Sequence, residues 1–408
     1  MSLVFLLFLH IFNPSGQAAV PSHPARHFKI RVNEEDPLRA ILDAGRRNLK
    51  WLNQVNTARA SKRSSVLDLS SASVIDNIIP DSPQTPESPL RYNGEILLKQ
   101  FRQLLAQAPR PFVQRVTGRA NLSADQAGMK DSSFLNWVAT LDFIYGYACR
   151  WVMSQDTLDS LSADATNDLR GYLFLTKDKN PEVRLQNYYF QPVRVQRQIF
   201  QALLQLCRNS QKTSEECFQE LSDPSGKIDA PLRLFQKYLP FGQKIWNSHF
   251  EIQNPRSDIV WTSDQAEVAT LRFYDPGTPA LKAWLKEKIE SAWKVGSWSL
   301  KIVFDSGFRR DIPHLLFAIG VTPTTDSVGG SIITLDQNMP LDQEDSISTI
   351  QHEFGHVLGF PDCYVEFYDS SEKMMITYSL SEKNLMCNDQ GHVLQSHYQE
   401  LKRVYFRE

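Results

Sequence analysis

Three features that would narrow the choice of function are missing from this 408-residue sequence. Basic and acidic residues number 44 and 46, so a net charge of -2 predicts neither a nucleic-acid nor an anionic-membrane partner. Beyond the first residues there is no apolar run of the about 20 residues that a membrane span needs. Internal repeats are absent. With 42% hydrophobic and 22% charged residues, the composition is typical of a globular protein of two or three domains.

The N-terminus carries one strongly apolar run, from Leu3 to Phe12. It is too short to cross a bilayer, and the small residues Gly16 and Ala18 follow it at positions suited to cleavage. We therefore expect residues 1–18 to be a signal peptide and the mature protein to be secreted or periplasmic. The alternative is a buried N-terminal strand or helix. No cysteine follows the run, so a lipid anchor is not expected.

The five cysteines fit an oxidising compartment. Cys207 and Cys217 are close in sequence, and Cys363 and Cys387 flank the two most informative segments of the chain. We predict one disulfide within each couple and a free thiol at Cys149, which lies in an apolar stretch. If the chain is not exported, the alternative is five reduced cysteines in the core.

Residues 19–255 have a mostly helical pattern. Apolar residues recur at helical spacing in segments 37–52, 95–105, 133–153, 194–207 and 231–246. Residues 58–92 are rich in Ser, Pro and Asp, which predicts a flexible surface linker. The region shows no spacing typical of catalytic residues or metal ligands. We expect it to be either a propeptide that covers a site elsewhere or a permanent accessory domain.

From residue 256 onward the pattern changes. Segments 268–274, 299–304, 314–320 and 330–336 predict strands, whereas 279–295 has the apolar face of a helix. Thr278 can cap that helix and Gly296 can end it. A second helix is expected to begin near Asp345 or Ser346. This order predicts a mixed domain over residues 256–408, distinct from the helical region before it.

The second helix carries the stretch QHEFGHVLGFPDCY, residues 351–364. His352 and His356 are four residues apart, so they lie on one helix face at the spacing of two nitrogen ligands to one zinc ion. Glu353 is placed to act as general base on a metal-activated water. The HExxH pattern alone also occurs by chance in chains of this length.

The residues that follow indicate a third ligand. Gly359 can adopt a positive φ that lets the chain leave the helix and turn back, and Pro361 prevents the helix from continuing. Asp362 then arrives close enough to His356 in sequence to complete a set of three ligands. The alternative is a plain helix stop with two packing or surface histidines, but the combined pattern favours the metal site.

The stretch HEFGHVLGFPD resembles the HExxHxxGxxH/D signature of metzincin zinc endopeptidases. With its aspartate it is similar to the snapalysin group of small secreted bacterial proteases. The resemblance implies that His352, His356 and Asp362 hold Zn²⁺, that Glu353 is the base, and that Tyr364 steadies the oxyanion. It also implies an α+β catalytic domain with a twisted mixed sheet and an active-site helix.

A metzincin also needs a methionine in a tight turn below the metal, and Met386 in the segment NLMCN is placed to supply it. In that setting a Cys363–Cys387 disulfide would tie the segment of the third ligand to this turn. Tyr378 is a second candidate for the oxyanion donor. The resemblance extends over 256–408 in the order of elements, but its motifs are confined to 351–364 and 384–388.

These patterns lead to the hypothesis of a secreted zinc-dependent endopeptidase that acts, as a monomer, on protein or peptide substrates. A secreted helical binding or structural protein with a vestigial zinc site is one alternative, although the intact Glu353 argues against it. A zinc hydrolase of non-peptide amides is the other.

Overall fold

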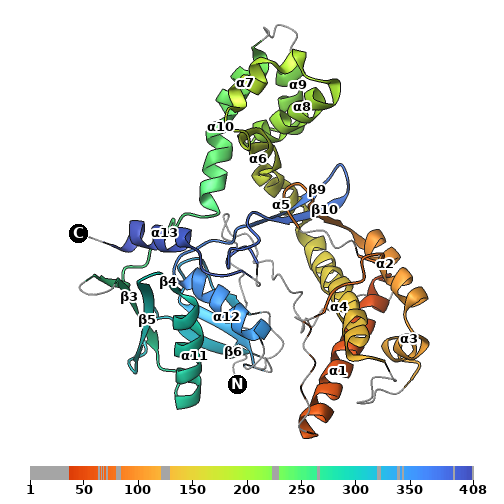
Figure 1. Ribbon diagram of the computed structural model, residues 1–408, viewed down its shortest axis with the longest axis vertical. Helices are drawn as coiled ribbons and strands as arrows, with labels where there is room; N and C mark the ends of the chain where they lie inside the picture. Colours follow the sequence, from red (N-terminus) through yellow and green to blue (C-terminus); the bar gives the residue numbers. More distant parts are fainter. Residues whose placement is uncertain are drawn as a thin grey trace, which may run out of the picture.

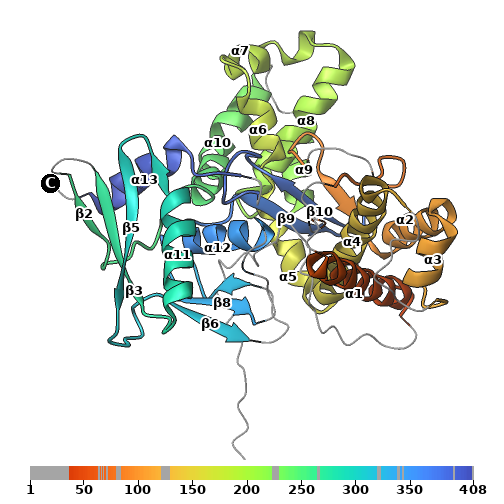
Figure 2. The ribbon, with the colours of Figure 1, turned by 60° about the horizontal axis from the view of Figure 1, so that its bottom comes forward.

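The computed structural model describes residues 36–62, 65, 67, 69, 72–79, 84–120, 129–222, 229–263, 267–318, 323–337, 341, 344–388 and 391–406. The expected signal peptide, residues 1–18, lies outside these ranges. In the described part of the chain, no helix is long and apolar enough to cross a membrane. The chain forms three lobes, each around its own hydrophobic core (Figures 1 and 2).

The first lobe consists of four helices, which are α1 (Arg39–Ser61), α2 (Gly94–Gln107), α3 (Arg110–Val116) and α4 (Asp131–Ser154). Helix α2 begins at Asn93, whose side chain accepts a hydrogen bond from the Ile96 amide at 3.0 Å and so caps the helix. Trp51 of α1 is fully buried against Phe112 and Phe134. The predicted helices at 37–52, 95–105 and 133–153 are present.

The second lobe consists of η2 (Gln155–Thr157), α5 (Leu158–Ala163), η3 (Asp164–Asn167), α6 (Arg170–Thr176), α7 (Pro181–Gln186), η4 (Tyr188–Phe190), α8 (Val193–Arg208), α9 (Ser214–Ser222) and α10 (Ala230–Ser248). Cys207 of α8 and Cys217 of α9 form a disulfide with a Cα–Cα distance of 5.9 Å, which confirms the predicted pair. Gly171 allows α6 to approach α8 closely, because a Cβ there would collide with the Ala202 carbonyl.

A three-stranded antiparallel sheet separates these two lobes. Its order is β1 (Leu90–Tyr92), β10 (Met374–Ser379), β9 (Tyr364–Asp369). Successive side chains of a strand point to opposite faces. Val365 and Phe367 of β9 pack into the core of the second lobe, whereas Met375 of β10 packs into that of the first. The hairpin β9–β10 therefore contributes to both helical cores, although it follows the predicted metal ligands in sequence (Figure 1).

The third lobe contains β2 (Val260–Thr262), β3 (Val268–Tyr274), α11 (Pro279–Ala292), β4 (Lys294–Val295), β5 (Trp298–Asp305), β6 (His314–Ala318), β7 (Thr324–Thr325), β8 (Ile332–Asp336), α12 (Glu344–Val357) and α13 (Gln395–Tyr405). Strands β3 and β5 are parallel, as are β6 and β8, and β7 pairs antiparallel with β8. The Tyr274 amide donates to the Pro313 carbonyl at 2.8 Å and so links β3 to β6. Helix α11 packs against β5 and α12 (Figure 2).

The prediction of a mixed α+β fold that follows a helical region is confirmed. The segments 268–274, 299–304, 314–320 and 330–336 correspond to β3, β5, β6 and β8. The helix predicted at 279–295 is present but ends at Ala292, because Lys294 and Val295 pair with β5 as strand β4. Gly296 therefore lies in the turn between β4 and β5 instead of ending the helix, and the Thr278 side chain makes no capping hydrogen bond. The hairpin β9–β10 and its pairing with β1 were not predicted. The pairing of β10 with β1 leaves no local pattern, because the two strands are distant in sequence.

The segment 58–92, interpreted as a flexible linker, is described only in part. Ile78 and Ile79 are buried in the core of the first lobe, and the segment ends in β1. The Ser379 amide of β10 donates to the Gln84 carbonyl at 2.7 Å. Apolar residues and strand pairing between the polar clusters thus attach these parts to the lobe, which the composition did not indicate.

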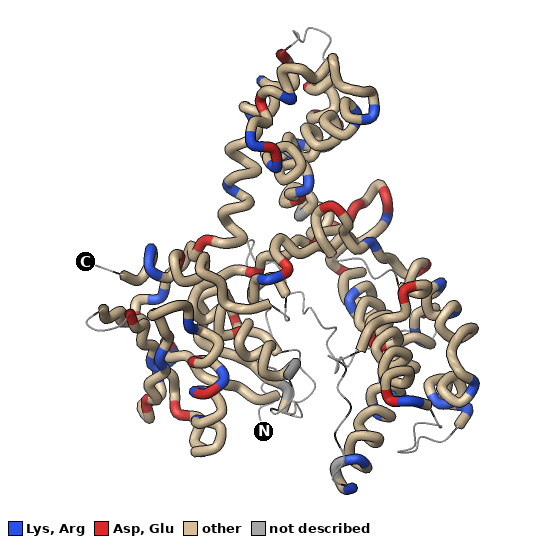
Figure 3. Tube along the Cα trace, in the orientation of Figure 1, with Lys and Arg blue, Asp and Glu red and all other residues tan. Residues whose placement is uncertain are grey.

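Basic and acidic side chains are interspersed along all three lobes (Figure 3). One buried pair stabilises the third lobe near α12. Arg256 contacts Asp258 at 2.8 Å and donates to the carbonyl oxygens of Gly329 and Gly330 at 3.1 and 2.7 Å. The Gly329 amide in turn donates to the His356 carbonyl at 2.7 Å. The turn before β8 is thereby fastened to the end of the histidine-bearing helix.

Candidate metal centre

Helix α12 places the two histidines of the HExxH stretch side by side. The ring centroids of His352 and His356 are 4.8 Å apart, with ring planes at 87°. Nδ1 of His352 lies 2.9 Å from the Leu385 carbonyl oxygen, and Nδ1 of His356 lies 2.8 Å from that of Phe360. Because a carbonyl oxygen only accepts hydrogen bonds, Nδ1 carries the proton of each neutral ring. The Nε2 lone pairs are therefore available to a metal ion.

The end of α12 turns the chain back toward these rings. The Gly359 amide donates to the His356 carbonyl at 2.9 Å and the Phe360 amide to the Gly355 carbonyl at 3.0 Å, which are the two bonds of a Schellman motif. Gly359 has φ +97°, and a Cβ there would lie 2.8 Å from Ile252 Cγ2. The predicted positive φ at Gly359 is confirmed.

Asp362 completes a convergent set of three ligand atoms. Its Oδ1 lies 3.1 Å from His352 Nε2 and 3.4 Å from His356 Nε2. Atoms that bind one zinc ion tetrahedrally at about 2.0–2.1 Å are themselves about 3.3–3.4 Å apart, so these distances fit a shared ion. Asp362 is only 5% exposed, and the two imidazole nitrogens are the only described polar groups directed at its Oδ1. Such a buried oxygen requires a partner, which a cation between the three atoms would provide.

Glu353 lies beside these atoms. The possible ligand atoms of His352, Glu353 and His356 also lie within 4.8 Å of one another. The Thr325 hydroxyl of β7 lies 2.9 Å from both Oε2 and the backbone oxygen of Glu353. The sequence analysis missed Thr325, because only the packing of β7 against α12 brings it to the base.

The charges of His352, His356 and Asp362 act strongly on one another. Burial lowers the pKa of His356, but the Asp362 carboxylate outweighs burial and raises this pKa to about 9. The pKa of His352 is raised for the same reason. Burial raises the pKa of Asp362, yet the two imidazoles outweigh this effect and hold it well below the usual carboxylate range. Asp362 is therefore ionised at neutral pH, as a metal ligand must be.

A tight turn at residues 384–387 lies under the helix. The turn contacts the helix at Gly355, where an added Cβ would collide with the sulfur of Met386. Cys387 forms a disulfide with Cys363 at a Cα–Cα distance of 4.5 Å, and the Cys363 amide donates to the Met386 carbonyl at 3.1 Å. The Cys363–Cys387 prediction is confirmed, and Cys149 is a buried free thiol as expected.

Two further residues shape this turn. Asn384 Oδ1 accepts hydrogen bonds from the Met386 amide at 2.8 Å and from His397 Nε2 at 2.9 Å. His397 Nδ1 accepts one from the Leu394 amide at 2.8 Å. Burial lowers the pKa of His397 to about 4, so the ring is neutral and donates through Nε2. The Leu385 carbonyl that holds His352 is thereby kept in position.

The two tyrosines considered as oxyanion donors lie in different places. The Tyr364 hydroxyl is hydrogen-bonded to the Asp362 side chain, and burial together with that carboxylate raises its pKa well above the usual value. Tyr364 thus contacts the third ligand as a protonated donor, and an oxyanion role for it stays a prediction. Tyr378 donates to Asp168 Oδ1 at 2.9 Å and accepts from the Leu169 amide at 2.8 Å. It belongs to the second lobe, not to the metal centre.

His249 was also missed by the sequence analysis. It follows the last turn of α10 and is 3% exposed. Its Nδ1 lies 3.1 Å from the carbonyl oxygen of Asp362. Burial lowers the pKa of His249, so the neutral ring donates through Nδ1 to that carbonyl. The second lobe therefore touches the backbone of the third ligand directly.

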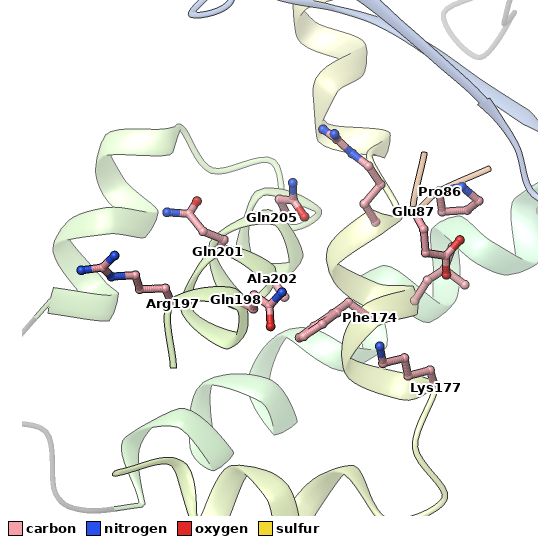
Figure 4. A pocket seen from close by; sticks show the side chains of 11 residues that line it. Pro86, Glu87, Phe174, Lys177, Arg197, Gln198, Gln201, Ala202 and Gln205 are labelled. Carbon is pink, nitrogen blue, oxygen red and sulfur yellow. The ribbon is translucent and has the colours of Figure 1, made fainter. Parts of the chain in front are cut away.

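A cavity of about 350 Å³ lies away from this centre, between α6 and α8. Its lining includes Phe174 of α6, Lys177 at the end of that helix, Gln198 and Gln201 of α8, and Glu87 (Figure 4). Its lining does not include the histidines, Glu353 or Asp362, so it is separate from the metal centre.

Comparison of the chain with models of protein families, with curated proteins and with solved structures found no match. Function must therefore be inferred from the geometry of the metal centre itself.

Proposed function

We propose that the protein is a zinc-dependent endopeptidase whose zinc ion is held by His352, His356 and Asp362. The observation that carries this proposal is the convergence of Asp362 Oδ1 on the two Nε2 atoms, at 3.1 and 3.4 Å. Three protein ligands of this type leave a fourth position open, which is typical of catalytic zinc, whereas structural zinc sites have four protein ligands.

Glu353 supports a catalytic role. When bound, zinc would polarise a peptide carbonyl and lower the pKa of a water molecule. Glu353 is held by Thr325 at 2.9 Å beside the ligands, where its carboxylate can take a proton from the attacking water and pass it to the leaving amine. A site that served only to bind metal would not need a carboxylate in this position.

The strand arrangement supports a peptide as substrate. Among the described strands, β7 pairs with β8 alone, and its Thr325 contacts the proposed base. A free strand edge beside a catalytic base can bind an extended peptide by strand addition. The parallel strands β3 and β5, the antiparallel β7 and the turn at Met386 below α12 are features expected of a metzincin-like fold.

The two disulfides support the proposal of a secreted or periplasmic protein, because such bonds persist in oxidising compartments.

The test is to measure zinc content and casein cleavage for the wild type and Glu353→Gln. We expect about one zinc ion per chain in both and a fall in cleavage of about 10²–10⁴-fold in the variant, since this is the usual effect of losing a general base. Glu287→Gln is the matched control, because Glu287 is exposed on α11 and pairs with Lys288 at 2.8 Å.

The other outcomes identify the alternatives. Zinc binding without Glu353-dependent cleavage of any amide would indicate a binding protein with a vestigial site. Glu353-dependent hydrolysis of small amides, with casein left intact, would indicate a non-peptide amidase.

A further inference from the structure

We propose that Arg150, on helix α4 of the first lobe, is a positioning residue for the metal centre and holds Asp362 in place through Glu366 and Tyr364. The inference rests on the proposed metal site. It implies that the helical region stabilises this site and is not a propeptide that can be removed without affecting it.

The hairpin β9–β10 turns one face of β9 toward the first lobe. Strand β9 begins at Tyr364, two residues after Asp362. Tyr364 and Glu366 are also two residues apart and so point to the same face of the strand. The opposite face carries Val365 and Phe367, which lie in the core of the second lobe. Tyr364 and Glu366 therefore face the first lobe.

A buried ion pair lies on that face. Arg150 Nη1 lies 3.4 Å from Glu366 Oε2, with the two side chains 8% and 18% exposed. The Arg150 guanidinium also lies 5.2 Å from the centre of the Tyr147 ring, and burial together with the nearby Glu366 carboxylate raises the pKa of Tyr92 of β1. A buried charge that loses its partner is strongly unfavourable, so this pair fixes how the hairpin sits on α4.

Tyr364 connects the hairpin to Asp362. The Tyr364 hydroxyl is hydrogen-bonded to the Asp362 carboxylate, whose Oδ1 faces both histidines. A shift of the hairpin on α4 would move Tyr364 and with it the orientation of this carboxylate. Groups that orient a metal ligand typically change metal affinity by 10–100-fold when they are replaced.

A second ion pair on the opposite face provides a matched control. Arg170 binds Asp168 through Nε and Nη2 at 2.9 and 2.8 Å, and its guanidinium lies 5.6 Å from the centre of the Phe367 ring. This pair also stabilises the hairpin, but from the face that does not carry Tyr364.

The experiment uses the full chain and Co²⁺ as the probe, because Co²⁺ reports the ligand geometry through its visible absorption. Three variants are compared with the wild type: Arg150→Met with Glu366→Gln, which leaves no unpaired charge; Arg150→Lys, which keeps the charge; and Arg170→Met with Asp168→Asn as control. Circular dichroism establishes that each variant is folded.

We expect the first variant to bind Co²⁺ about 10–100-fold more weakly, with a changed absorption spectrum. Arg150→Lys should keep most of the wild-type affinity for Co²⁺, and the affinity of the control for Co²⁺ should stay within about threefold of the wild type. The proposal is overturned if the folded first variant binds Co²⁺ like the wild type, or if the control weakens binding equally. If the wild type itself binds no metal, the proposed function fails together with this inference.

Discussion

Two adjoining segments of the chain, residues 352–362 and the hairpin β9–β10, reach their conformations by different routes. In the first, His356 is oriented by the Phe360 carbonyl four residues away, and the turn at Gly359 is made by bonds within the same helix end. In the hairpin, the partners are distant. Met375 pairs with Tyr92, and Glu366 pairs with Arg150, 216 residues earlier.

The comparison shows that the proposed ligands and the groups that support them are positioned by different kinds of interaction. The proposed zinc ligands are arranged mainly by short-range geometry, so a motif of eleven residues is enough to reveal them. The groups that support the proposed ligands and base from a distance, such as Thr325, Asn384 and His249, come from other segments of the chain. We therefore expect local changes to alter the metal site directly and changes in the hairpin to act through Asp362.

The largest effect is expected from removing a disulfide, and the two disulfides should differ in their influence on metal binding. Replacing Cys363 and Cys387 by serine should lower the free energy of unfolding by about 3 kcal/mol, and replacing Cys207 and Cys217 should cost a similar amount. Only the first replacement should also weaken metal binding, because that bond ties the Asp362 segment to the turn at Met386. Urea unfolding and zinc titration of both variants provide the test. Equal loss of zinc affinity in the two would remove the distinction.

The second prediction concerns pH and the local segment. With a pKa of about 9, His356 is protonated at pH 7 and must release its proton before it binds a metal ion. Zinc affinity should therefore rise by about tenfold per pH unit between pH 7 and 9, which corresponds to about 1.4 kcal/mol per unit. Competition with a chromophoric chelator measures this slope. A flat profile would show that Asp362 does not raise the pKa of His356.

The third prediction concerns the contact between α12 and the turn below it. Alanine usually stabilises a helix interior by about 1 kcal/mol relative to glycine, but at Gly355 the added Cβ meets the Met386 sulfur. Overpacking costs about 1–3 kcal/mol, so after the helical gain Gly355→Ala should destabilise the protein by up to about 2 kcal/mol. In a Met386→Ala background the same change should be neutral or stabilising. Thermal unfolding of the four proteins of this cycle measures the coupling, and additive effects would rule out the contact.

The smallest effect concerns the support of the base. Thr325→Val removes the hydroxyl that lies 2.9 Å from Glu353 Oε2, a hydrogen bond whose net contribution is about 1–1.5 kcal/mol. We expect kcat/KM for casein peptides to fall about 5–10-fold while zinc content is unchanged. Thr324→Val is the control, because the Thr324 hydroxyl is exposed and donates to the Thr325 carbonyl at 3.2 Å. A loss of zinc in Thr325→Val would indicate a structural effect instead.

Much of the third lobe could be predicted from the sequence. Strands β3, β5 and β8, helix α11 and the Cys363–Cys387 disulfide follow from periodicity and the positions of the cysteines, as does the Cys207–Cys217 disulfide of the second lobe. The attachment of the hairpin β9–β10 to β1 could not be predicted, because nothing in residues 364–379 identifies the distant strand Leu90–Tyr92 as the partner. The position of Tyr378 in the second lobe could not be predicted either, because its hydrogen-bond partner Asp168 lies 210 residues earlier in the sequence.

The sequence by itself determined the candidate ligand set and the turn that brings these residues together. Histidines one helical turn apart, a glycine that adopts a positive φ and an aspartate three residues later have few other arrangements. The tertiary structure alone decided which distant groups surround the candidate ligands. Thr325, Asn384 and His249 reach the centre through the packing of segments far apart in the sequence. Such contacts depend on the whole chain, because burial and hydrogen bonding select a partner by its place in space and not by its distance in sequence.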